Sequence, residues 1–171
     1  MKRTRGLAIA RKALAAGMLV GVAAYAGSAV AQQEHSNIVC RAGNITGLAK
    51  AEDMVSYAIE HRGIVLAQGD NKDFDNQTQH CVGAVAIIRG VSTGSGYCRN
   101  VDAATGDLVL VEWEASGKPG TGTFRYVYGT GKWKGITGRG EYQPVAATRP
   151  VGPGTYQNCI RAKATYTVPK M

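Results

Sequence analysis

The stretch Gly129–Tyr142 reads GTGKWKGITGRGEY. It holds five glycines and two large apolar side chains, Trp133 and Ile136, spaced three residues apart. Glycine permits positive φ angles and close backbone approach that a Cβ forbids, and this spacing fits one tight helical turn better than strand alternation. The stretch predicts a strand, a glycine-rich turn that carries both side chains into a core, and a second strand from about Thr137. The residues expected to have this structural role are Gly129, Gly131, Trp133, Gly135, Ile136 and Gly138.

The segments around this stretch have the alternation of β-strands and are joined by short loops. About eight such segments leave no room for long crossover helices, so their pairing is expected to be antiparallel. Closing the sheet into an eight-stranded β-barrel removes its edges, and a two-sheet β-sandwich is the alternative. The expected segments are 36–41, 54–68, 78–88, 91–101, 108–115, 123–128, 137–145 and 156–168.

The first 31 residues have the pattern of an export signal peptide. Five basic residues lie within the first twelve positions, residues 13–30 carry no charge, and residues 29–31 (AVA) form an A-x-A cleavage site. An uncleaved membrane anchor is the alternative, because the uncharged run approaches the length that spans a bilayer. We expect cleavage after residue 31. A single domain of residues 32–171 would then be periplasmic or secreted by a bacterium, without membrane attachment.

The charge of the chain comes largely from this leader. The full sequence has 20 Lys and Arg against 12 Asp and Glu, a formal net charge of +8. Five of the basic residues lie in the leader, so the domain that follows has fifteen and a net charge of only +3. Because no block of like charges remains, nucleic acid is not an expected partner.

All four cysteines lie in the domain that is expected to be exported. An even number in an oxidising compartment predicts two disulfides, and zinc is disfavoured because no C-x-x-C pair is present. Residues 88–91 (IRGV) predict a two-residue hairpin turn with glycine at its second central position. The resulting register places Cys81 directly opposite Cys98. Cys40 and Cys159 then remain, on the first and last strands, which meet when a barrel closes.

The segment GTGKWKGITG (residues 129–138) resembles the G-G-[ST]-G-x-[FY]-x-G-x-x-G signature of allene oxide cyclases and dirigent proteins, and of related bacterial barrel proteins of unknown function. The resemblance implies an eight-stranded antiparallel barrel that holds an apolar ligand in its lumen. Tyr128 stands where the first glycine of the signature doublet would be. The catalytic carboxylates of the plant families have no counterpart that can be placed on this chain, so the resemblance implies a fold and no reaction.

Aromatic side chains supply the candidate ligand site. Phe124, Tyr126 and Tyr128 share one strand face, and together with aromatic residues of other strands they could line a lumen as apolar walls with a few hydroxyls. A filled core is the alternative for so narrow a barrel. The candidate ligand-binding residues are Tyr57, Trp113, Phe124, Tyr126, Tyr128 and Tyr166.

The other polar constellations have plainer interpretations. Glu112 and Glu114 alternate with Val111 and Trp113, so both carboxylates are expected in solvent rather than in a paired-carboxylate site. His35 is expected in a flexible end, whereas His61 and His80 are interpreted as ordinary strand histidines. The acidic loop 70–76 (DNKDFDN) is expected to be solvated, with a weak calcium site as the alternative.

These patterns favour a non-catalytic, exported β-barrel that binds a small apolar or aromatic molecule. A cofactor-free cyclase or isomerase of the same fold is one alternative, since shape and exclusion of water can suffice for such chemistry. A structural or interaction module with a filled core is the other. No catalytic residue, metal or cofactor is predicted, and the oligomeric state is left open.

Overall fold

The computed structural model describes residues 31–169. The predicted signal peptide therefore lies outside the described residues, apart from Ala31. No helix within residues 31–169 is long and apolar enough to cross a membrane. The elements of this range are β1 (Gln33–Ala51), β2 (Met54–Gln68), β3 (Gln77–Ile88), β4 (Val91–Val101), β5 (Leu108–Gly117), β6 (Gly122–Gly129), the 3-10 helix η1 (Gly131–Trp133), β7 (Thr137–Ala147) and β8 (Thr155–Thr167).

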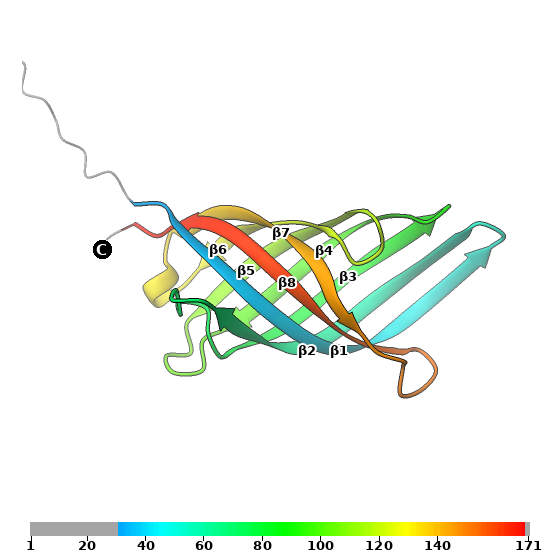
Figure 1. The fold of residues 1–171 in the computed structure, drawn as a ribbon, viewed down its shortest axis with the longest axis horizontal. Coiled ribbons are helices and arrows are strands. Elements are labelled where there is room, and N and C mark those ends of the chain that lie inside the picture. Colours follow the sequence, from blue (N-terminus) through cyan, green and yellow to red (C-terminus); the bar gives the residue numbers. More distant parts are fainter. Residues whose placement is uncertain (1–30, 170–171) are drawn as a thin grey trace, which may run out of the picture.

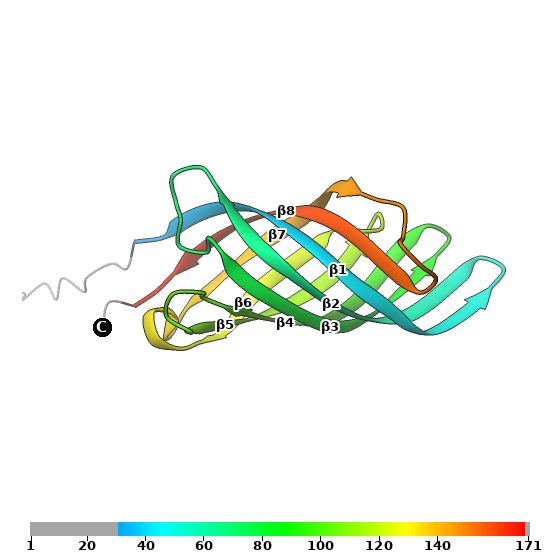
Figure 2. The ribbon, with the colours of Figure 1, turned by 90° about the horizontal axis from the view of Figure 1, so that it is seen from below.

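The strands form one closed antiparallel barrel (Figures 1 and 2). Each strand pairs with the next along the chain, and β1 pairs with β8 from Gln33 opposite Tyr166 to Asn44 opposite Thr155. This continuous seam confirms the predicted barrel and excludes the β-sandwich alternative. Closure gives every strand two neighbours, which removes the exposed edges of an open sheet.

The two ends of the barrel are built differently. One end, here called the η1 end, carries η1, the β2–β3 and β4–β5 loops, the start of β1 and the end of β8 (Figure 1). The opposite end, here called the hairpin end, carries the tight β1–β2, β3–β4 and β5–β6 turns together with the β7–β8 connection (Figures 1 and 2). The lumen between them is lined by alternate residues of every strand.

The glycine-rich stretch forms the turn that its sequence predicts. Trp133 and Ile136 are only 2% and 3% exposed, and η1 supplies the single helical turn between β6 and β7. Gly129 is required by close approach, because a Cβ there would lie 2.2 Å from the carbonyl oxygen of Trp133. Gly131 begins η1 with a φ of +49°, in the left-handed region that favours glycine.

Both disulfides join the cysteines that the register predicts. Cys81 lies directly opposite Cys98 on β3 and β4 and is bonded to it inside the barrel. Cys40 lies opposite Cys159 across the β1–β8 seam and is bonded to it. One bridge therefore ties a hairpin, and the other covalently closes the seam over a sequence separation of 119 residues.

Candidate functional site

The barrel lumen is hollow. A cavity of about 370 Å³, here called the lumen chamber, lies between the η1 end and the hairpin end and is lined by residues of all eight strands. Pro119 and Ala147 line the chamber and are exposed to solvent, so it reaches the surface at the hairpin end. Its volume falls in the range of small-molecule sites.

The η1 end of the lumen is closed by a cluster of rings, here called the aromatic plug: Phe74, Tyr126, Trp133 and Tyr166. Phe74 is 2% exposed, stacks on Trp133 at 4.5 Å and on Tyr126 at 5.5 Å between ring centroids, and meets Tyr166 edge-on at 5.1 Å. Such aromatic pairs add to the stability gained by burying their area. The plug therefore forms the inner wall of the chamber.

Polar side chains of the acidic β2–β3 loop hold Phe74 in this position. The Asp75 Oδ1 atom accepts a hydrogen bond from the Ala67 backbone N–H at 2.8 Å, and the Asp73 carboxylate accepts one from the Tyr166 hydroxyl. Asn71 donates to the backbone oxygen of Glu34 at 2.8 Å. Two of the loop carboxylates thus serve internal contacts that fix the plug.

Trp113 leaves the centre of the chamber open because it is recessed into the wall. A Cβ at Gly83 would lie 2.2 Å from Cζ2 of the Trp113 ring, and a Cβ at Gly96 would lie 2.5 Å from the same atom. The two glycines, on β3 and β4, therefore provide the space into which the indole packs. Any side chain in their place would push the ring toward the lumen.

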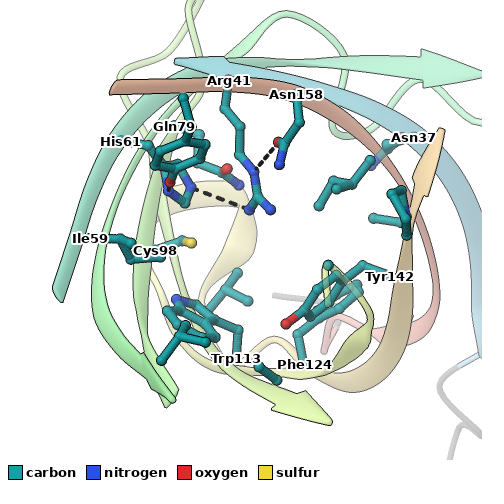
Figure 3. Close-up of a pocket in the computed structure, with 18 of the residues that line it drawn as sticks. Asn37, Arg41, Ile59, His61, Gln79, Cys98, Trp113, Phe124, Tyr142 and Asn158 are labelled. Carbon is teal, nitrogen blue, oxygen red and sulfur yellow. Dashed lines mark hydrogen bonds between the residues drawn. The ribbon is translucent and has the colours of Figure 1, made fainter. Parts of the chain in front are cut away.

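A polar cluster of β1, β2 and β8 forms the opposite part of the wall. Arg41 extends from β1 toward the centre of the chamber, where its guanidinium faces the space between Trp113, Phe124 and Tyr142 (Figure 3). Its Nε donates to Asn158 Oδ1 at 2.8 Å, and its Nη1 lies 3.4 Å from His61 Nε2. The remaining guanidinium hydrogens face the chamber.

His61 is the neutral centre of this cluster. Burial, reinforced by the charge of Arg41, lowers the pKa of His61 to about 3. Because a guanidinium can only donate, Nε2 must accept from Arg41, so the proton of the neutral ring is on Nδ1. That proton points to the Tyr156 hydroxyl oxygen at 2.5 Å. Burial raises the pKa of Tyr156 to about 12, so its hydroxyl keeps its own proton.

A second buried histidine lies beside the aromatic plug. His35 Nε2 is 2.5 Å from the Tyr126 hydroxyl, and Asn37 Nδ2 donates to His35 Nδ1 at 2.9 Å. Burial lowers the pKa of His35 to about 4. The expectation that His35 lies in a flexible end is wrong: β1 begins at Gln33, and pairing with β8 places His35 inside the barrel, 7% exposed.

The structure brings four of the six candidate ligand-binding aromatics to the chamber: Tyr57, Trp113, Phe124 and Tyr126. Tyr166 is 1% exposed and belongs to the plug. Tyr128 does not point into the lumen, and its exposed fraction is 56%. The β5–β6 register shifts between Leu110 and Val111, so the alternation of Phe124 and Tyr126 is interrupted before Tyr128. A β-bulge of this kind turns the next side chain to the other face.

The remaining polar constellations are structural. Glu112 accepts a hydrogen bond from the Tyr97 hydroxyl at 2.9 Å and pairs with Arg125 on the outer face of the barrel, as the strand alternation predicts. A ring nitrogen of His61 and the sulfur atoms of Cys81 and Cys98 lie within 4.8 Å of one another. Those sulfurs are bonded to each other, so the group offers no thiolate to a metal.

The main chamber-lining side chain that the sequence did not single out is Arg41. It shares a strand face with His35, Asn37 and Val39, and this parity is the one signal that places it inside. A strand face that carries several polar residues is usually the face exposed to solvent. The shared parity therefore places Arg41 inside the barrel only when the inward face of β1 is known.

The comparisons with known proteins bear on the fold. The sequence matches no protein-family model and no curated protein. The solved structure of the pterocarpan synthase dirigent protein PsPTS1 is similar, with a TM-score of 0.51, 10% sequence identity, and coverage of 82% of this chain and 97% of that one. The chain has the dirigent-type barrel fold. A second pterocarpan synthase dirigent protein, GePTS1, has a TM-score of 0.49 at 10% identity, with coverage of 82% and 93%.

Proposed function

We propose that this barrel is an exported binding protein that takes up a small apolar or aromatic molecule in its lumen chamber. The observation that carries the proposal is the hollow: aromatic rings line about 370 Å³ of space that no side chain fills. A module with a filled core would have no such space. Two disulfides among residues 31–169 agree with an oxidising compartment, in keeping with a bacterial export signal.

The same substitution, alanine to tryptophan, at two positions tests the site. Ala115 lines the chamber, whereas Ala84 is exposed on the outer face of β3. Ala115→Trp should fill the chamber and weaken binding of the neutral probe N-phenyl-1-naphthylamine by about tenfold or more. Ala84→Trp adds the same volume outside and should leave binding unchanged. Equal binding by both variants, measured as probe fluorescence, would place the probe elsewhere and contradict the proposal.

Native mass spectrometry of the protein purified from a bacterial periplasm examines the natural ligand and the export signal together. A co-purified small molecule is expected on the wild-type protein and not on Ala115→Trp. The intact mass of the same sample should correspond to a chain that begins at Gln32. A mass that retains residues 1–31 would contradict export with cleavage at the predicted site.

A cofactor-free cyclase or isomerase of the same fold is the second candidate function. The specific observation that favours it is that Arg41 and the Tyr156 hydroxyl, each in contact with His61, lie at one wall of the chamber. Such donors stabilise negative charge as it develops on a reacting oxygen. Turnover of the bound molecule, followed by mass spectrometry over time, separates an enzyme from a binding protein.

A further inference from the structure

The lumen chamber contains one charged side chain. Its lining residues include no Asp, Glu or Lys, and its two histidines, His35 and His61, are held neutral by burial. Arg41 is therefore the only group of the lining that is ionised at neutral pH. Burial lowers the pKa of Arg41, but a guanidinium loses its proton only far above neutral pH.

Nothing in residues 31–169 neutralises this charge. The ion pairs of this part of the chain involve Glu60, Asp53, Glu112 and Asp102, all with cations other than Arg41. The hydrogen-bond partners of Arg41 are the amide oxygen of Asn158 and the neutral ring of His61. Arg41 is half-buried, and a cation withdrawn from water without a counter-charge is less favourable than the same cation beside an anion.

A second donor converges on the same space. Arg41 donates to His61 Nε2, His61 Nδ1 donates to the Tyr156 oxygen, and the Tyr156 proton is left without a partner in this chain of bonds. Tyr156 also lines the chamber. The wall therefore offers guanidinium and phenol hydrogens, but no carboxylate to compete for them.

We propose that the ligand of the lumen chamber carries an anionic oxygen group, a carboxylate in the simplest case, which binds Arg41 and Tyr156 while its apolar body packs against Trp113 and Phe124. This inference rests on the proposed function and adds the charge of the ligand to it. The geometry predicts an amphiphilic anion, with its head at the β1–β8 wall and its rings or chain directed across the lumen (Figure 3).

A pair of probes that differ only in the anionic group tests the proposal. 8-Anilinonaphthalene-1-sulfonate has the same rings as N-phenyl-1-naphthylamine and adds a sulfonate. We expect the sulfonate to bind the wild-type protein about tenfold more tightly than the neutral probe, because hydrogen bonds to a charged group are the stronger ones. Arg41→Met should remove this preference, so that the sulfonate and the neutral probe bind the variant about equally. Tyr156→Phe should reduce the preference for the sulfonate by a smaller factor than Arg41→Met.

A competition experiment tests the same preference for an anionic ligand on the wild-type protein alone. 1-Naphthoate should displace the bound fluorophore from wild-type protein at about a tenth of the concentration required of 1-naphthamide, its neutral analogue. Equal potency of the two, or a sulfonate preference that survives in Arg41→Met, would overturn the inference while the proposed binding function stands. Failure of all four molecules to bind, or binding that Ala115→Trp leaves intact, would overturn both.

Discussion

The two parts of the lumen have opposite contents. At the η1 end, the aromatic plug fills the cross-section with rings from a loop, a helical turn and two strands. In the lumen chamber, Trp113 is recessed against two glycines, and a single long side chain, Arg41, extends into open space. The same barrel geometry therefore permits either a packed core or a cavity, and a few side chains determine which of the two forms.

The aromatic plug and the lumen chamber also differ in what they contribute to stability and to binding. The plug buries apolar area and contributes to the free energy of folding. The chamber instead retains an unneutralised charge and an unfilled volume, both of which lower stability. Features that cost stability without an evident structural benefit are typical of functional sites.

The largest effect is expected from truncating one phenylalanine in each part. Phe74→Ala should lower the free energy of unfolding by about 3–5 kcal/mol, because it removes a fully buried ring from the packed plug. Phe124→Ala should cost only about 1–2 kcal/mol, since Phe124 is half-buried and already borders the chamber. Urea unfolding of both variants measures the difference. Equal losses would mean that the chamber is packed as tightly as the plug.

An effect of intermediate size is expected from the two buried histidines at low pH. Their pKa values in the folded protein, about 4 for His35 and about 3 for His61, lie below the ordinary value of 6.5, so the unfolded chain binds protons more readily. The stability that the two neutral histidines contribute is complete above pH 6.5. It is lost as the pH falls toward 4 for His35 and toward 3 for His61. Between pH 6.5 and 5 each histidine should cost about 1–2 kcal/mol.

The two histidines can be told apart by their neighbours. The charge of Arg41 lowers the pKa of His61, whereas Asp73 opposes the effect of burial on His35. Arg41→Met should therefore raise the pKa of His61 and leave that of His35 unchanged. NMR titration of the two ring signals measures both values. Unfolding at pH 7.5 and pH 5 of His35→Gln and His61→Gln gives the matching stabilities, and an unaltered pH dependence in both would contradict the assignment.

Much of the fold was predictable because its determinants are local. The alternation of the strands, the glycines around Trp133 and the turn at Arg89 and Gly90 each constrain a few neighbouring residues, and together they fix the register that pairs Cys81 with Cys98. Barrel closure then leaves Cys40 and Cys159 for the seam. The resemblance of residues 129–138 to the dirigent signature agrees with the observed barrel.

The site was less predictable because it depends on contacts between distant residues. Arg41, His61 and Tyr156 come from β1, β2 and β8, and no short pattern connects them. The position of His35 required knowing that β1 begins before it, and the inward face of β1 became clear only from its pairing with β8. Whether the lumen is filled is decided by how rings pack, as the recessed Trp113 shows.

The smallest effect is expected at Tyr128, where the alternation rule failed. Tyr126 and Tyr128 are two residues apart, but the shifted β5–β6 register places the first in the plug at 7% exposure and the second on the surface at 56%. Tyr128→Ser should change the free energy of unfolding by less than about 0.5 kcal/mol, as for other exposed positions, and should leave probe binding as in wild type. Tyr126→Phe removes only the hydroxyl that meets His35, yet it should cost about 1–2 kcal/mol, because it leaves a buried histidine nitrogen unpartnered. Urea unfolding of the two variants, with probe titration of each, makes the comparison. A larger loss from Tyr128→Ser than from Tyr126→Phe would mean that the strand continues without the bulge and that Tyr128 faces the lumen after all.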